Sequence, residues 1–195
     1  MKKLLLILLC LPMIGFGQSW KHWSGGNAFD GNSRVSYVVG SGSDSPYNEP
    51  TMSISFSEKS EKISFSISGA GYYPDWIMVL FSFDNEEGNV YQSNSITPSY
   101  DNNTLSFGSE FSLIDNTIVY EYKDSPRKKI ATIDRIEIFK KLMDASFVNF
   151  KIMNKPNVNY IKFSLSGSTK AIKNTIPKID ELYEQISLAK RDTTE

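Results

Sequence analysis

The sequence has very few of the side chains on which metal, thiol and histidine chemistry depend. Its 195 residues include one cysteine, Cys10, and one histidine, His22. A disulfide needs two cysteines and a zinc site needs several Cys or His ligands, so we expect neither a disulfide nor a metal. The G-x-G-x-x-G and G-x-x-x-x-G-K-[ST] patterns are also missing. We therefore expect no phosphate-binding loop and no nucleotide cofactor.

An excess of charge is missing too. The formal net charge is -1, with 21 Lys and Arg against 22 Asp and Glu. A nucleic-acid-binding protein normally has a basic excess that attracts phosphates, so we expect no nucleic-acid partner. Hydrophobic residues make up 40% of the sequence, which is enough for one folded domain with its own core.

The N-terminal residues have the layout of a secretory signal peptide. Two lysines precede an apolar run at residues 4–14, and Gly15 and Gly17 place small residues ahead of a cut before Gln18. The run is shorter than the roughly 20 residues that span a bilayer. No later uncharged run approaches that length. We therefore expect a mature protein without a transmembrane segment.

Export is the localisation that this signal predicts. Removal of residues 1–17 would leave a secreted or periplasmic protein without cysteine. An uncleaved N-terminal anchor is the alternative. Cys10 follows Leu9 rather than a small residue, so we do not expect a lipoprotein.

Most of the remaining sequence has the alternation of β-strands. In residues 51–57 and 62–68 every second residue is apolar, and nearly all the residues between them are serines. Period two places the apolar side chains on one face and the serines on the other. The linker at residues 58–61 is short and polar, which predicts that the two strands form a hairpin.

Residues 76–83 are different because they begin with an uninterrupted apolar run. Such a run of strand length predicts a central strand covered on both faces. The other predicted strands are residues 34–39, 90–93, 104–107, 111–114, 117–122, 147–153 and 160–165. Many short strands with few helices predict a mainly β protein, folded as an antiparallel β-sandwich or a flattened barrel.

Two helix signals interrupt the strands. Asp134 and Glu137 form a predicted capping box, followed by apolar residues at helical spacing around Phe139. Ser168 is a candidate cap for a short helical turn that includes Ala171.

The C-terminal tail has a third helix signal, opened by Pro177. Its apolar residues repeat at helical spacing, at Ile179, Leu182, Tyr183, Ile186 and Ala189. We therefore divide the protein into a signal peptide (1–17), a β-sandwich domain (18–176) and a C-terminal helical tail (177–195). The amphipathic tail packs on the sandwich or pairs with a partner, and the second alternative would make the protein an oligomer.

Several short segments between Trp20 and about Ile172 occur in an order that resembles one protein family. They are Trp20 or Trp23 ahead of Phe29-Asp30-Gly31; Pro50-Thr51-Met52-Ser53-Ile54; Val79-Leu80-Phe81-Ser82-Phe83-Asp84; Ile138-Phe139-Lys140-Lys141-Leu142; and Phe163-Ser164-Leu165-Ser166-Gly167-Ser168 followed by Ala171-Ile172. In this order they resemble the VasI-like proteins associated with type VI secretion and the related invasion-associated locus B type. The resemblance implies an exported, non-catalytic β-sandwich. The sequence departs from the family pattern at Ser82, where the family has Arg, and it lacks the family's cysteines.

The sequence does not predict a catalytic site. A Ser-His-Asp or Cys-His site would have to use His22, which lies between two tryptophans near the predicted mature N-terminus. We expect a structural or exposed role for this histidine. A glycosidase needs two carboxylates that converge across a cleft, and sequence spacing does not bring Asp75 and Asp84 together. We therefore expect no enzymatic activity.

Aromatic residues provide the better functional hypothesis. Rigid rings beside a carboxylate suit the recognition of peptide, protein or sugar. The candidate residues for binding a ligand or partner are Trp20, Trp23, Tyr72, Tyr73, Asp75 and Trp76. Alternatively, these rings cover the open ends of the sandwich.

From these patterns we expect an exported, non-enzymatic β-sandwich protein that binds another protein or an envelope component. The alternative function is a carbohydrate-binding module or a weak glycan hydrolase that uses Trp20, Trp23, Asp75 and Asp84. An envelope glycan is therefore the second kind of partner that the sequence predicts.

Overall fold

The computed structural model describes residues 19–27, 31–42, 49–69, 71, 77–84, 89–101, 103–115, 129–154 and 157–192. Three sequence predictions lie outside these ranges: the signal peptide at 1–17, the strand at 117–122, and the site residues at 72–76.

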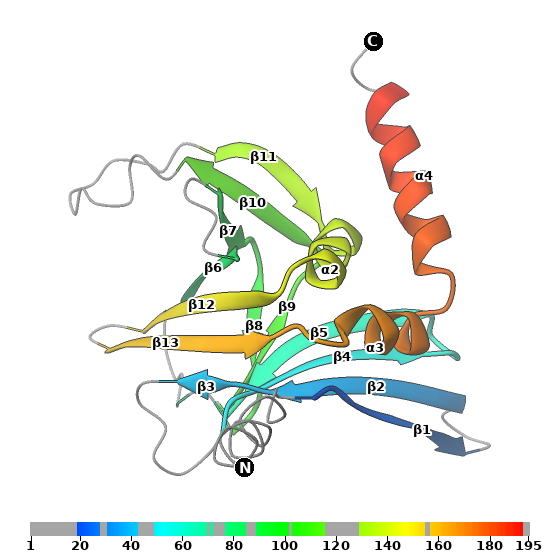
Figure 1. Ribbon diagram of the computed structural model, residues 1–195, viewed down its shortest axis with the longest axis horizontal. Helices are drawn as coiled ribbons and strands as arrows, with labels where there is room; N and C mark the ends of the chain where they lie inside the picture. The colour runs from blue at the N-terminus through cyan, green and yellow to red at the C-terminus, as the bar shows by residue number, and fades with distance from the viewer. Residues whose placement is uncertain are drawn as a thin grey trace, which may run out of the picture.

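Two antiparallel sheets contain the strands of the described residues (Figure 1). The first sheet has the order β1 (Lys21–Asn27), β2 (Gly31–Val39), β4 (Thr51–Ser57), β5 (Lys62–Ser68), β9 (Thr104–Phe107) and β8 (Ile96–Pro98). The second has the order β11 (Lys129–Asp134), β10 (Glu110–Asp115), β7 (Asn89–Ser93), β6 (Met78–Phe83), β12 (Phe147–Asn154), β13 (Asn157–Ser164) and β3 (Ser41–Gly42). The predicted antiparallel β-sandwich is confirmed.

The β4–β5 hairpin forms as its alternation predicts, with Thr51 paired to Ser68 and Ser57 paired to Lys62. The inward side chains of this hairpin are fully or almost fully buried at Met52, Ile54, Phe65 and Ile67. The serines between them point to the other side of the sheet. The hydrophobic effect therefore sets which face of the first sheet meets the core.

Strand β6 lies between β7 and β12, as a central strand should. Val79, Leu80 and Phe81 are consecutive and all buried, so both faces of the strand are covered. The Phe81 ring is stacked on Phe150, with 5.2 Å between the ring centroids, and meets Phe111 edge-on at 5.6 Å. The core between the two sheets is thus largely aromatic.

Helix α2 (Arg135–Asp144) starts at the predicted capping box. The Asp134 carboxylate accepts the Ile136 N–H at 2.7 Å, and the Glu137 carboxylate accepts the Asp134 N–H at 2.8 Å. The fully buried residues Ile138 and Phe139 anchor the helix against the core.

Helix α3 (Ser168–Thr175) packs against the inner side of β1, β2 and β4. The residue at its N-terminus corrects one sequence prediction. Gly167, not Ser168, occupies the cap position, and it adopts φ 83°, a conformation that favours glycine. Ser168 is the first helical residue and is buried, so it does not cap the helix.

Helix α4 (Ile179–Asp192) stands at the side of the sandwich next to α2 (Figure 1). Ile179 is buried, and Leu182, Tyr183 and Ile186 pack against the core, so the apolar face of the tail is used within the molecule. Assembly through this helix stays a prediction. Among the residues that the structure describes, none of the helices is both long and apolar enough to cross a bilayer.

Candidate functional site

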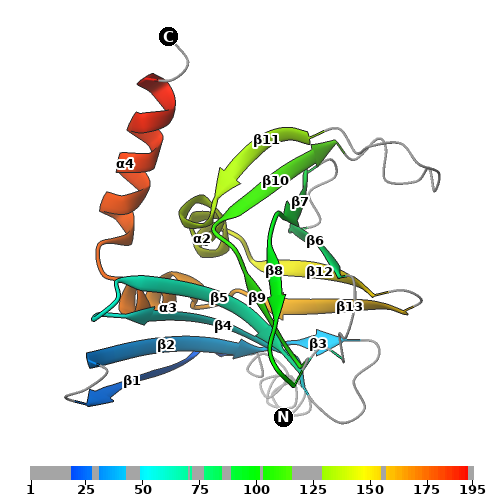
Figure 2. The ribbon, with the colours of Figure 1, turned by 180° about the vertical axis from the view of Figure 1, so that it is seen from behind.

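A groove opens where the first sheet loses a strand. All of β5, from Lys62 to Ser68, pairs with β4, but β9 pairs only with the part of β5 that begins at Phe65. After Phe107 the backbone turns away through Gly108 into β10, which belongs to the other sheet. Figure 2 shows β5 extending past β9 at this point. The first residues of β5 therefore have a strand neighbour on one side only.

We call this opening the edge groove, and its volume is about 680 Å³. It is lined by residues 61–64 before and within β5, by residues 106–109 where β9 leads into β10, by Ser95 and Thr97, and by residues 134–136 at the start of α2. Its polar lining combines hydroxyl side chains with two acidic residues, Glu61 and Asp134, and two basic ones, Lys62 and Arg135. Phe107 and Ile63 provide apolar surface. Such a mixed lining suits a ligand that has both apolar and polar groups.

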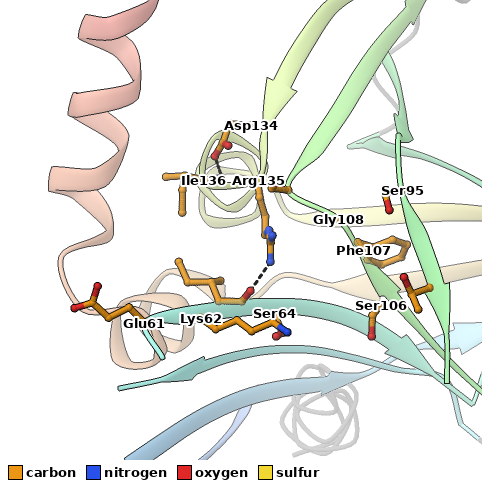
Figure 3. Close-up of a pocket in the computed structure, with 13 residues that line it drawn as sticks. Glu61, Lys62, Ser64, Ser95, Ser106, Phe107, Gly108, Asp134, Arg135 and Ile136 are labelled. Carbon is orange, nitrogen blue, oxygen red and sulfur yellow. Dashed lines mark hydrogen bonds between the residues drawn. The ribbon is translucent and has the colours of Figure 1, made fainter. Parts of the chain in front are cut away.

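Arg135 points from the start of α2 across the edge groove toward β5 (Figure 3). Its Nη1 atom donates a hydrogen bond to the Ile63 carbonyl. That bond uses one of the five N–H donors of the guanidinium. Burial lowers the pKa of Arg135 from its ordinary value, and the neighbouring Asp134 carboxylate opposes this effect. None of the ion pairs between described residues includes Arg135.

The Ile63 N–H also faces the edge groove. Backbone groups of a strand point alternately to its two sides, and the N–H and C=O of one residue point to the same side. Gly69 N–H bonds the Asn103 carbonyl on the β9 side, and Ile63 lies an even number of residues before Gly69. The groove therefore holds an open strand edge beside an arginine whose charge has no ionic partner in the described structure.

Of the predicted aromatic site, Trp20 and Trp23 are described, and they have different environments. Trp20 packs against the core, and its indole N–H is buried without an acceptor among the described residues. Trp23 lies on the opposite side of β1 and is 54% exposed. Only Trp23 of this pair therefore presents its ring to a ligand.

Tyr72, Tyr73, Asp75 and Trp76 lie outside the described residues. Asp84, the other carboxylate of the predicted glycan hydrolase, has a local role. Its Oδ1 atom accepts the backbone N–H groups of Ser146 at 2.8 Å and Phe147 at 2.9 Å, which fixes the start of β12.

His22 bonds a buried hydroxyl rather than a substrate-accessible group. Its Nδ1 atom lies 2.9 Å from the Ser36 hydroxyl, which is fully buried between β2 and α3. A nucleophile must reach its substrate, and the buried Ser36 hydroxyl cannot. The imidazole itself is exposed, so His22 fits the structural or exposed role that the sequence predicts. Beside it lies a second cavity of about 510 Å³, in which Arg34 pairs with Glu58 at 2.7 Å.

Arg135 is a site residue that the sequence does not predict. Its position directly after a capping box indicates only a helix start, and nothing local shows that β9 leaves the sheet opposite it. The capping box itself, which fixes where α2 begins, is the one available signal.

No protein-family model, curated protein or solved structure matches this sequence. The resemblance to VasI-like proteins therefore stays a prediction from its short motifs.

Proposed function

We propose that this molecule is an exported, non-enzymatic protein that binds an extended segment of another protein in the edge groove. The observation that supports this most is the open edge of β5 at Ile63, with the Arg135 guanidinium beside it. Export rests on the predicted signal peptide at residues 1–17.

An extended peptide matches the edge groove because it can continue the sheet. Peptides that add a strand to an open edge bind through main-chain hydrogen bonds, and side-chain pockets then provide specificity. Here the Ile63 N–H is the donor of the main-chain hydrogen bond. The groove lies beside residues 62–64 of β5, where β9 no longer pairs with this strand. Phe107, the last residue of β9, provides an apolar contact at one end of the groove.

Arg135 determines the chemistry of the segment. A partly buried guanidinium without an ionic partner gains from a carboxylate, which it can hold through two parallel N–H bonds. We therefore expect the bound segment to place an Asp, a Glu or a C-terminal carboxylate next to Arg135. Lys62 also lines the groove, but the acidic residues Glu61 and Asp134 balance the two positive charges. The preference for a carboxylate therefore rests on the geometry of Arg135 and not on the net charge of the lining.

A displayed library of random linear peptides tests this proposal with the mature protein as bait. We expect the selected peptides to be enriched in acidic residues. The Arg135→Gln variant should bind them at least roughly tenfold more weakly, as expected for a lost charge-assisted bond. Lys170→Gln removes an exposed charge on α3, away from the groove, and should bind like the parent.

A second pair of variants tests the strand edge. Ile63→Pro removes the N–H that faces the groove but keeps the β4–β5 hydrogen bonds, which residues 62 and 64 make. Ile63→Ala removes the side chain and keeps the N–H. We expect only the proline variant to lose peptide binding. Selected peptides without acidic enrichment, or peptides that bind both Arg135→Gln and Ile63→Pro like the parent, would contradict the proposal.

A further inference from the structure

The outer side of the first sheet presents a continuous array of hydroxyl groups. Every outward position of β4 is Ser or Thr, and the array continues across β5, β9 and β8. We call it the hydroxyl face; it consists of Thr51, Ser53, Ser55, Ser57, Ser64, Ser66, Ser68, Thr97, Thr104 and Ser106. Helix α3 and the second sheet lie on the inner side of the first sheet (Figure 1).

Strand register aligns these hydroxyls in straight rows across the sheet. In one row Ser53 pairs with Ser66, Ser66 with Ser106, and Ser106 with Thr97. The strands that carry a row are about 4.8 Å apart, and rows repeat about every 6.7 Å along the strands. The Ser53 and Ser66 hydroxyls are hydrogen-bonded at 2.8 Å, which holds both side chains in place.

The hydroxyl face is nearly free of charge. Among the outward positions of the six strands, the charged residues are Lys21 on β1 and Lys62 at the start of β5, both at the margin. Exposed protein surfaces normally mix Lys, Arg, Asp and Glu at about a quarter or more of their positions. Apart from these two marginal lysines, the described strands give an ionic ligand no counter-charge on this face, whereas hydroxyls donate to and accept from a neutral polar ligand.

An aromatic platform borders the same face. Trp23 on β1 and Tyr37 on β2 both point outward and are diagonal neighbours, about 7–8 Å apart. The Lys21 ammonium lies over the Tyr37 ring, 5.9 Å from its centroid, so Trp23 is the ring of this pair that a ligand can stack on. The Trp23 ring lies over Gly25, because a Cβ atom added there would be 2.7 Å from its Cζ2 atom. With one side of the indole against the strand, the other side is open to solvent.

We infer that the hydroxyl face and Trp23 together bind a neutral glycan. A sugar ring has apolar C–H faces that stack on an aromatic ring, and its rim of hydroxyls pairs with the protein's hydroxyls. The glycan crosses the strands along a row, with one sugar on Trp23 and the next sugars over β4 and β5. This site is separate from the peptide function: Ser64, Thr97 and Ser106 also line the edge groove, but Trp23, Ser53 and Ser55 do not.

Affinity electrophoresis of the mature protein in gels that contain one neutral polysaccharide each tests this inference. The probes are hydroxyethyl cellulose, laminarin, galactomannan, soluble starch, dextran and glycol chitin in its acetylated form. We expect at least one of them to retard the parent protein. Trp23→Ala should weaken that binding roughly tenfold, since it removes the stacked ring.

Two further variants separate binding from folding. Gly25→Ala keeps Trp23 but displaces its ring, so it should weaken glycan binding although every aromatic residue remains. Tyr160→Ala removes an aromatic side chain of nearly the same exposure, 55%, from the second sheet and should bind like the parent. Ser55 and Ser64 continue the row of Trp23 through Val35, so a double change of these two serines to alanine should also weaken binding.

Arg135→Gln should leave glycan binding unchanged, which distinguishes failure of this inference from failure of the peptide proposal. A parent protein that no probe retards would overturn the inference. It would also be overturned if Trp23→Ala and Gly25→Ala were retarded as strongly as the parent.

Discussion

A network of buried hydroxyls joins β2 to α3, and its removal should be strongly non-additive. Thr175 Oγ1 lies 2.6 Å from Ser36 Oγ, and each hydroxyl also lies within hydrogen-bond distance of the Ala171 carbonyl, at 3.0 Å and 3.1 Å. Both residues are fully buried. A buried hydroxyl that loses a partner has no water to replace it, so each single substitution should be costly.

We expect Thr175→Val to lower the free energy of unfolding by about 1 kcal/mol, because Ser36 keeps the Ala171 carbonyl and His22 as partners. Ser36→Ala should lower it by about 1–2 kcal/mol, since it removes a bond to Thr175, a bond to Ala171 and the partner of His22. The double variant removes both hydroxyls together. It should therefore cost about 1 kcal/mol less than the sum of the single variants.

Urea unfolding followed by tryptophan fluorescence measures all four corners of this cycle. A loss of about 1 kcal/mol corresponds to a fall in Tm of about 2–4 °C for a protein of this size. Thr175→Ser keeps the hydroxyl and is the matched control. Losses that add to within about 0.3 kcal/mol would refute the reasoning, because they would mean that the two hydroxyls do not share a bond.

Two other predictions concern single carboxylates. Asp84 combines φ 47° with hydrogen bonds from Ser146 and Phe147, so Asp84→Ala should cost about 2–3 kcal/mol and Asp84→Gly about 1 kcal/mol less in urea unfolding. Equal losses would mean that the backbone conformation contributes nothing. The hydrogen bond from Arg34 lowers the pKa of Glu58 below its ordinary value of 4.5. The ionised Glu58 therefore stabilises the folded protein fully above pH 4.5, and this stabilisation is lost as the pH falls through the lowered pKa. Glu58→Gln should therefore reduce the loss of stability between neutral pH and about pH 3, and an unchanged acid dependence would contradict this linkage.

Elements with a local pattern follow from the sequence alone. Strands β4 and β5 have the predicted bounds, because strict alternation leaves one way to bury their apolar side chains. Helix α2 starts where Asp134 and Glu137 predict it, since a capping box acts within one helical turn. The amphipathic spacing of the tail likewise predicts α4 without any knowledge of its contacts.

Strand β1 forms because of its neighbour. Its sequence, Lys-His-Trp-Ser-Gly-Gly-Asn, has no apolar alternation, and it becomes a strand by pairing with β2 along its whole length. Strand β11 likewise includes Lys129, although the local composition is typical of a solvated loop. Edge strands obtain much of their order from a neighbouring strand, and single-sequence patterns do not contain that neighbour.

Both candidate sites are also products of long-range pairing. The serines of β4 and β5 are visible in the sequence as a solvent-facing set, but their alignment with β9 and β8 depends on register between distant segments. Arg135 faces an open strand edge only because β9 ends at Phe107 and the backbone then crosses to the other sheet. The alternation of apolar residues and the capping of a helix depend on residues that are close in the sequence. Strand register and strand order depend on which distant segments bury their apolar faces together.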